Sequence, residues 1–253
     1  MSGAPVLIHR QGPVLVAALN RADKKNALTG EMYSALNQTL ETASDDDEIR
    51  AVLIASEGAV FTAGNDINDF AARAMAGGDL GDSPGGKFIR ALARFEKPLV
   101  AAVDGLAVGI GTTLCFHCDL VYASPRASFK MPFVDLGLVP EAGSSRLATQ
   151  RFGWAKAAEF LLLGESFGAE EALRLGFVNE IVAADVLRAH ALAKAQALAA
   201  KPRNALLTTR RLMRGDAQPL YDHIEVELQA FAAAVRSPEA RTAFMAFLSR
   251  SKG

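Results

Sequence analysis

The first part of the chain alternates short apolar runs with amphipathic segments. Two runs rich in β-branched residues, Val6 to His9 and Val14 to Asn20, flank a Gln-Gly-Pro turn and predict a β-hairpin. From Thr29 to Ala43, apolar residues recur every four positions behind a threonine suited to capping, which predicts an amphipathic helix. The apolar run from Ala51 to Ala55 predicts a buried strand.

The same alternation continues from residue 87 to residue 123. It predicts a helix at Lys87 to Phe95, a strand at Leu99 to Val103, a glycine-rich turn into a helix at Gly111 to His117, and a strand at Leu120 to Ala123. Strands that alternate with helices indicate an α/β fold with a mostly parallel sheet and helical crossovers.

Beyond Ser144 the pattern is mainly helical, and only Phe177 to Val182 indicates a further strand. The expected helices are Trp154 to Leu163, Ala169 to Leu175, Ala184 to Ala200, Asn204 to Met213, Leu220 to Val235 and Pro238 to Leu248. Lys201-Pro202 separates two of these helices. We therefore expect a core over residues 1–195 and a C-terminal helical subdomain over residues 196–253. That subdomain would pack on the core or on a neighbouring subunit.

One segment, Met75 to Gly86, is rich in glycine and carries no apolar periodicity. We expect a flexible loop there, and such loops often cover binding sites.

Composition narrows the classes of partner. The 253 residues suffice for one large α/β domain, and a net charge of −1 with scattered basic residues favours a protein without nucleic-acid partners. The start of the chain has no secretory pattern, and the last three residues, Ser-Lys-Gly, do not form a peroxisomal signal, so we expect a cytoplasmic protein. Asp104 interrupts the longest apolar stretch, which indicates a buried core segment and no membrane span.

Cys115 and Cys118 bracket His117, a spacing that raises the question of a metal site. A structural zinc site needs a second pair of ligands, which the chain lacks at suitable spacing. We expect no metal and two reduced thiols packed on a buried helix.

The segment FTAGNDINDF, residues 61–70, is the first that could contribute to binding or catalysis. Gly64 permits a sharp turn, and the exposed amide of Asn65 can point at an anion or a polarised carbonyl. The alternative is an ordinary strand-to-helix connection capped by Asn65 or Asp66.

The segment VDGLAVGIGTT, residues 103–113, also leads from a strand into a helix. Gly109 and Gly111 allow close backbone approach, and the free amides of the first helical turn suit a phosphate or an oxyanion. The spacing lacks the third glycine of a dinucleotide-binding fingerprint. Tight core packing explains these glycines equally well.

The segment FVDLGLVPEAGSSRL, residues 133–147, places Glu141 between an apolar run and Ser144 or Ser145, either of which can cap the next helix. Apolar neighbours can desolvate this carboxylate and raise its pKa, which would make it a usable general base. The alternative is a solvent-facing glutamate in a loop.

Taken together with RADKKNAL at residues 21–28 and DLVYAS at residues 119–124, these segments resemble the crotonase superfamily of enoyl-CoA hydratases and isomerases, and most of all its Δ3,Δ2-enoyl-CoA isomerase branch. The resemblance runs from about Ile8 to Val182. It implies a crotonase-like spiral of ββα units with a C-terminal helical subdomain. It also implies trimers or dimers of trimers.

The resemblance further implies the roles of individual residues. The backbone amides of Asn65 and Ile110 would hold the thioester oxygen of an acyl-CoA substrate, and Glu141 would be the catalytic base. The implied contacts to substrate and CoA are Lys24, Lys25, Ala27, Ala63, Asp66, Ile67, Gly109 and Phe133. Without the resemblance, Lys24 and Lys25 are equally well explained as surface residues. Coenzyme A would enter as part of the substrate, and no separate cofactor is expected.

Two departures from the family pattern favour one reaction. The hydratases that resemble this chain carry two glutamates, and the corresponding positions here are Thr113 and Phe133. Because neither residue can replace a carboxylate, we expect a double-bond shift from 3-enoyl-CoA to 2-trans-enoyl-CoA with Glu141 as base. The alternatives are a hydratase that uses Glu141 with water or another acid, a non-catalytic acyl-CoA binding module, and a nicotinamide oxidoreductase.

Overall fold

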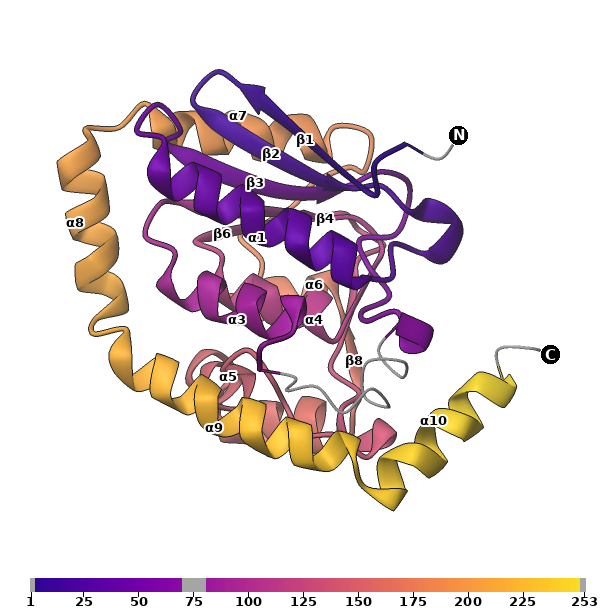
Figure 1. The fold of residues 1–253 in the computed structure, drawn as a ribbon. Helices are drawn as coiled ribbons and strands as arrows, with labels where there is room; N and C mark the ends of the chain where they lie inside the picture. Colours follow the sequence, from indigo (N-terminus) through magenta and orange to yellow (C-terminus); the bar gives the residue numbers. More distant parts are fainter. Residues whose placement is uncertain (1–2, 70–80, 251–253) are drawn as a thin grey trace.

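The computed structural model describes residues 3–69 and 81–250 (Figure 1). Its larger sheet has the order β1-β2-β3-β4-β6-β9. β1 (Val6–Gln11) and β2 (Val14–Leu19) form the predicted antiparallel hairpin. β3 (Ala51–Ser56), β4 (Leu99–Val103), β6 (Leu120–Ala123) and β9 (Glu180–Ile181) follow in parallel, which confirms the α/β class and the mostly parallel sheet.

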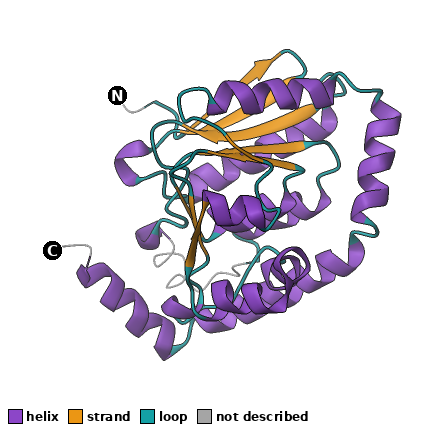
Figure 2. Cartoon of the chain, turned by 180° about the vertical axis from the view of Figure 1, so that it is seen from behind, coloured by secondary structure: helices purple, strands orange, loops and turns teal. Residues whose placement is uncertain are grey.

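Helices cover both faces of this sheet (Figures 1 and 2). α1 (Gly30–Asp45) and α3 (Pro84–Arg94) pack into one hydrophobic cluster, and α7 (Leu187–Ala199) packs against the opposite face. All residues of β2 and β4 are buried, as expected for strands covered on both sides. Thr29 caps α1 by accepting a hydrogen bond from the Met32 amide, as predicted.

A second sheet, in the order β5-β7-β8, carries the turn before the central short helices. It consists of β5 (Leu106–Val108), β7 (Ser128–Lys130) and β8 (Ser166–Gly168), and β7 lies between the other two. The sequence did not predict these strands, because three residues are too few to show alternation. β5 leads directly into α4 (Ile110–Thr113) and the 3₁₀-helix η2 (Leu114–His117), where a single helix was expected.

Beyond Ser144 the described chain is mainly helical, as predicted, with the short strands β8 and β9 between its helices. Three short helices complete the description. η1 (Ala22–Lys24) lies between β2 and α1, η3 (Val134–Leu136) lies between β7 and α5, and α6 (Ala169–Arg174) follows β8. α5 (Ser144–Leu162) begins ten residues before the expected Trp154 and bends at Gly153, whose φ of 74° is not helical. α8 (Arg203–Arg214), α9 (Gln218–Val235) and α10 (Pro238–Arg250) then run around the outside of the core (Figure 1). The division at residue 195 stays a prediction.

The expected loop at Met75 to Gly86 is partly helical. α3 begins at Pro84, because the Ser83 hydroxyl accepts a hydrogen bond from the Gly86 amide and proline suits the first helical position. Residues 75–80 lie outside the described residues.

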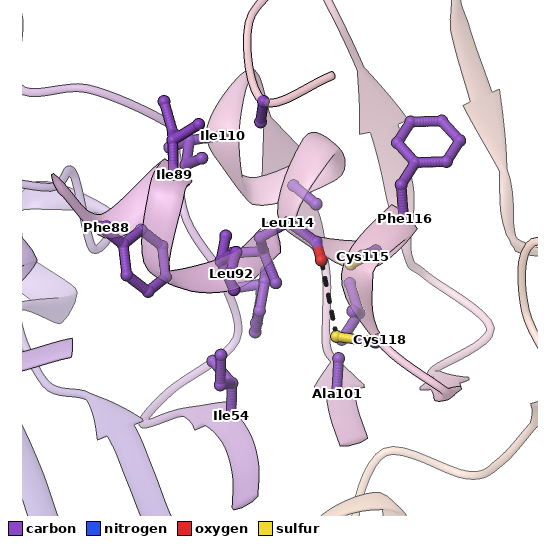
Figure 3. Packing of buried hydrophobic residues seen from close by; sticks show 14 of the residues in the cluster. Ile54, Phe88, Ile89, Leu92, Ala101, Ile110, Leu114, Cys115, Phe116 and Cys118 are labelled. Carbon is purple, nitrogen blue, oxygen red and sulfur yellow. Dashed lines mark hydrogen bonds between the residues drawn. The ribbon is translucent and has the colours of Figure 1, made fainter. Parts of the chain in front are cut away.

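Cys115 and Cys118 are both buried, which confirms their predicted packing (Figure 3). The Cys118 thiol donates to the Leu114 carbonyl at 3.6 Å, and burial raises the pKa of both thiols. In the part of the chain that the structure describes, no three His, Cys, Asp or Glu side chains gather into a potential metal site. Nor does any described helix have the length and apolar character needed to cross a membrane.

Candidate functional site

Two of the chemically suggestive segments lie side by side. The Thr62 amide donates to the Leu106 carbonyl at 2.9 Å, and the Val108 amide donates to the Thr62 carbonyl at 3.0 Å. These bonds form a parallel bridge between Thr62 and Ala107, just before Asn65 in one segment and Ile110 in the other. The backbone turns that carry the two predicted amides are therefore fixed relative to each other.

Glycines make this approach possible. Gly64 has a φ of +88°, and a Cβ there would lie 2.9 Å from the Val108 carbonyl oxygen. Gly109 has a φ of +54° with open space where a Cβ would stand. Both positions thus require glycine for their backbone conformation.

The backbone amides of Asn65 and Ile110 donate to no acceptor within the described part of the chain. Ile110 is the first residue of α4, where the helix itself offers its amide no acceptor. The Asn65 side chain is held separately, since its Oδ1 accepts a hydrogen bond of 2.5 Å from the Tyr33 hydroxyl of α1. The predicted alternative, a connection capped by Asn65 or Asp66, holds as well. The Asp66 carboxylate accepts hydrogen bonds from the Asn68 and Asp69 amides and so caps the next helix.

Glu141 is buried, with only 5% of its surface exposed. Its Oε1 accepts a hydrogen bond of 2.5 Å from the Thr113 hydroxyl of α4. Burial raises the pKa of Glu141 to about 8; the Thr113 hydrogen bond lowers it, and the nearby Glu227 carboxylate raises it. The expectation of a desolvated carboxylate is confirmed, and a solvent-facing glutamate is excluded.

The predicted serine cap of the next helix is wrong. Gly143 is the N-cap residue of α5, and neither Ser144 nor Ser145 makes a side-chain capping bond. Instead, Glu227 of α9 accepts hydrogen bonds from the Gly143 amide at 2.6 Å and the Ser145 amide at 3.0 Å. Because 82 or more positions separate these partners, no local pattern indicates the contact.

Glu141, Asn65 and Tyr33 line a common cavity of about 60 Å³. Its lining combines the site of Glu141 and Asn65 with apolar residues of α9, Leu228 and Phe231. The other lining residues are Leu28, Gly30, Tyr33, Asp66, Asp69, Ser83, Pro84, Gly85, Gly86 and Ile89. A larger cavity, of about 490 Å³, lies between η2, α5, α8 and α9 and contains none of the predicted site residues.

Tyr33 is a site residue that the sequence did not single out. It lies in this cavity, and burial raises the pKa of its hydroxyl well above the usual range, with further contributions from Glu141 and Asp69. The only sequence signal was its place in α1 directly after the buried Met32.

The predicted CoA contacts gather along one strip of backbone. The Ala63 amide donates to the Lys25 carbonyl at 2.9 Å, and the Leu28 amide donates to the Gly64 carbonyl at 2.8 Å. Lys24 and Lys25 are exposed, while Ala27, Ala63 and Ile67 are half-buried. The structure thus brings both loops to one edge of the site.

Asp66 belongs to this strip as well. Its carboxylate pairs with Arg21 at 2.7 Å. Burial opposes its ionisation, but the hydrogen bonds from Arg21 and from the Asp69 and Asn68 amides prevail and lower the pKa of Asp66.

Gly109, Ile110 and Phe133 are not among the residues that line the cavity. Phe133 is buried in the main hydrophobic cluster, and the Gly109 amide donates to the Lys130 carbonyl at 2.8 Å.

The chain resembles known proteins over nearly all of its length. The family model described as enoyl-CoA hydratase/isomerase matches residues 9–253. The chain is 35% identical to enoyl-CoA delta isomerase 2 of Rattus norvegicus over 97% of its own length, and it spans 63% of that protein. It is 31% identical to 2,3-dehydroadipyl-CoA hydratase of Escherichia coli K12, over 97% of this chain and 96% of the relative.

Solved structures match 97% of the chain. The structure of Pseudomonas aeruginosa OdaA has a TM-score of 0.92 and 44% identity, and the match covers 97% of this chain and 99% of that one. An enoyl-CoA hydratase/isomerase from Pseudoalteromonas atlantica has a TM-score of 0.91 and 38% identity, with 97% of each chain covered. The match over residues 9–253 and the shared crotonase-like fold show that this chain belongs to the enoyl-CoA hydratase/isomerase family.

Proposed function

We propose that this chain is an enoyl-CoA isomerase that moves the double bond of a 3-enoyl-CoA to the 2-trans position. The observation that carries the proposal is the buried carboxylate of Glu141, which lines the same cavity as Asn65. Thr113 and Phe133 stand where related hydratases carry glutamates, and Thr113 serves here as a hydrogen-bond donor to Glu141. One carboxylate suffices for a double-bond shift, because the same group can remove and return the proton.

In the proposed reaction, Glu141 takes a proton from C2 of the 3-enoyl thioester. The electrons of the C2–H bond move toward the thioester carbonyl and form a dienolate. Glu141 then returns the proton at C4, and the double bond closes between C2 and C3. No water, oxidant or further cofactor is consumed. A base with a pKa of about 8 suits this cycle, since proton transfer is most efficient when the pKa lies near the working pH.

The proposed oxyanion contacts are the amides of Asn65 and Ile110. Negative charge grows on the thioester oxygen as the C2 proton leaves, and preorganised donors stabilise it most in a site shielded from water. Each such donor contributes about 2.7 to 4 kcal/mol to the transition state. The Thr62 bridge supports this role, because it fixes the spacing of the two turns before substrate arrives.

The other carboxylates of the cavity are already engaged. Asp66 pairs with Arg21, and Asp69 accepts a hydrogen bond from the Gly30 amide at 3.0 Å. Hydration would need a second group to activate water beside Glu141. The described lining residues include no second carboxylate free of such a partner. This favours isomerisation over the hydratase that the sequence left as an alternative.

The proposed CoA site follows the strip formed by residues 24–27 and 63–67. The exposed ammonium groups of Lys24 and Lys25 suit the phosphates of CoA. Coenzyme A is then part of the substrate.

The experiment is incubation of the purified protein with a trans-3-enoyl-CoA, followed by mass spectrometry and by absorbance of the conjugated 2-enoyl thioester. Isomerisation leaves the mass unchanged, whereas hydration adds one water. In Glu141→Gln, turnover is expected to fall on the order of 10²- to 10⁴-fold, the usual contribution of a general base, while CoA-thioester binding persists.

Glu170→Gln is the matched control, because Glu170 is an exposed carboxylate of α6. It should turn over like the unsubstituted protein. Comparable turnover by Glu141→Gln, or a product heavier by one water, would contradict the proposal.

A further inference from the structure

The Glu227 carboxylate of α9 is buried directly behind the turn that carries Glu141. Only 6% of its surface is exposed. Its Oε2 accepts from the Gly143 amide at 2.6 Å, and its Oε1 accepts from the Ser145 amide at 3.0 Å and the Ser145 hydroxyl at 2.5 Å. One carboxylate therefore satisfies three donors at the start of α5, where the helix offers its own amides no acceptors.

The turn held in this way has an unfavourable backbone conformation. Ala142 has a φ of 59° and Gly143 a φ of 72°, so two left-handed residues follow Glu141 in succession. A non-glycine residue in this region is strained and persists only where its surroundings hold it. On the other side, the His117 imidazole donates to the Ala142 carbonyl at 2.7 Å. The turn is thus clamped between η2 and α9.

We propose that Glu227 is a positioning residue for Glu141, which fixes the turn that carries this carboxylate and places a second negative charge behind it. The inference rests on the proposed role of Glu141 as base. Glu227 reaches neither the cavity nor the reacting atoms, since it is not among the residues that line the cavity. Leu228 and Phe231, which lie near Glu227 on α9, do line the cavity. α9 therefore contributes both to the cavity wall and to the hydrogen bonds that hold the turn of Glu141.

The polar groups around Glu141 shift its pKa in opposite directions. Glu227 raises the pKa of Glu141 by repulsion, whereas the Thr113 hydroxyl lowers it by donating to the anion. Other polar groups near this region include Tyr33 of α1, Asp66 and Asp69 in the cavity lining, His117 of η2 and His223 of α9. His223 contacts the Ser145 hydroxyl at 2.8 Å and lies 3.5 Å from Glu227.

The test uses substitutions that separate charge from shape. Glu227→Gln keeps the shape and removes the charge, and Glu227→Asp keeps the charge and shortens the reach. Thr113→Val removes the opposing hydrogen bond. Asp222→Asn removes an exposed negative charge from the same helix, where the Asp222 carboxylate accepts a hydrogen bond from the Gln218 side chain, and serves as the control. For each full-length variant, kcat/KM is measured against pH with the 3-enoyl-CoA.

Because Glu141 must be ionised to act as base, kcat/KM rises with pH through the pKa of Glu141. Glu227→Gln is expected to move this rise to lower pH, and Thr113→Val is expected to move it to higher pH. Glu227→Asp should leave it in place but lower kcat on the order of 10²-fold, the cost of a small misplacement of a catalytic group. Asp222→Asn should match the unsubstituted protein.

A purely structural role of Glu227 would lower activity in both Glu227 variants without moving the pH dependence, and that result would overturn the proposal. If Glu227→Gln does not fold, undiminished kcat in Glu227→Asp would overturn it equally.

A second readout does not depend on the reaction. The carboxyl carbon of Glu141 is followed by NMR during a pH titration of protein labelled at glutamate, with Glu141→Gln used for assignment. A lower titration midpoint in Glu227→Gln supports the inference even where no isomerase activity is found, and an unchanged midpoint overturns it. Failure of the proposed function is thereby distinguished from failure of this inference.

Discussion

Glu141 combines a catalytic position with an unfavourable environment for its charge. Burial raises its pKa from the usual 4.5 to about 8, so the folded protein keeps a proton that the unfolded chain releases between these values. Stability therefore falls as pH rises from about 4.5 to about 8, because the unfolded state becomes the more ionised one.

Glu141→Gln is expected to remove this dependence. The Gln carbonyl can still accept the Thr113 hydrogen bond, and no charge has to be buried at high pH. The melting temperature of the variant should equal that of the unsubstituted protein near pH 4 and exceed it at pH 9, by a stability gain on the order of a few kcal/mol. Thermal unfolding at both pH values measures this. If the two proteins differ in melting temperature by the same amount at pH 4 and at pH 9, burial does not raise the pKa of Glu141.

Tyr33 offers a second test at this scale. Its hydroxyl holds the Asn65 side chain, and Tyr33→Phe leaves the Asn65 Oδ1 without this donor. We expect a loss of about 1 to 3 kcal/mol in unfolding free energy and a lower kcat, because the turn with the Asn65 amide is less firmly held. Chemical denaturation and steady-state kinetics measure the two effects. Tyr122→Phe, on the opposite face of the sheet, is the control that should leave kcat unchanged.

At the scale of elements, the decisive contact is between α4 and the Thr62 bridge. A Cβ on Gly111 would lie 2.4 Å from the Thr62 Cγ2, so one methyl group forbids any residue but glycine there. The Thr62 hydroxyl is needed as well, since it donates to the Asn26 carbonyl at 2.7 Å and accepts from the Gly64 amide.

Gly111→Ala should therefore lower stability by about 1 to 3 kcal/mol through overpacking and reduce activity by separating the two proposed oxyanion turns. Thr62→Ser removes the methyl group and keeps the hydroxyl, so the double variant should recover much of both losses. A double-mutant cycle on unfolding free energy and on kcat/KM measures the coupling. Additive losses would mean that this contact does not set the spacing of the turns.

At the scale of the whole molecule, the C-terminal helices present apolar side chains to solvent. Leu212 and Met213 of α8 are 78% and 82% exposed, and Val226 of α9 is 61% exposed. Contiguous exposed apolar patches are typical of surfaces that associate, and Leu212 and Met213 are neighbours on α8. They support the assembly that the resemblance implies, which stays a prediction.

We expect sedimentation to give a mass of three or six chains. Met213→Glu should weaken the assembly, because it would place a charge in an apolar contact. Glu170→Gln, on α6, is the control that should sediment normally. A monomer under the conditions of the activity assay would contradict this expectation.

Sequence patterns were sufficient for the long elements of the fold. The four-residue spacing of α1 and the apolar runs of β3 and β4 were predicted within a few residues, since each element repeats its pattern several times. β5, β7 and β8 were missed, because each has only three residues. For α5, the sequence indicated a helix start near Ser144 but assigned the cap to a serine, whereas the capping acceptor is the distant Glu227 carboxylate.

For the site, local sequence singled out Asn65, the glycine turn around Gly109 and Glu141, because glycine turns and a carboxylate in apolar surroundings are visible in a few neighbouring residues. The assignment of the second amide to Ile110 came from the family resemblance. Which groups surround Glu141 depended on the tertiary structure. Thr113 lies 28 residues away and Glu227 still further along the chain, and they meet Glu141 only through the packing of α4 and α9. The sequence alone thus determined the α/β class and the chemical groups present. Only the folded chain decided how strongly Glu141 holds its proton, because that depends on burial and on charges brought together from distant segments.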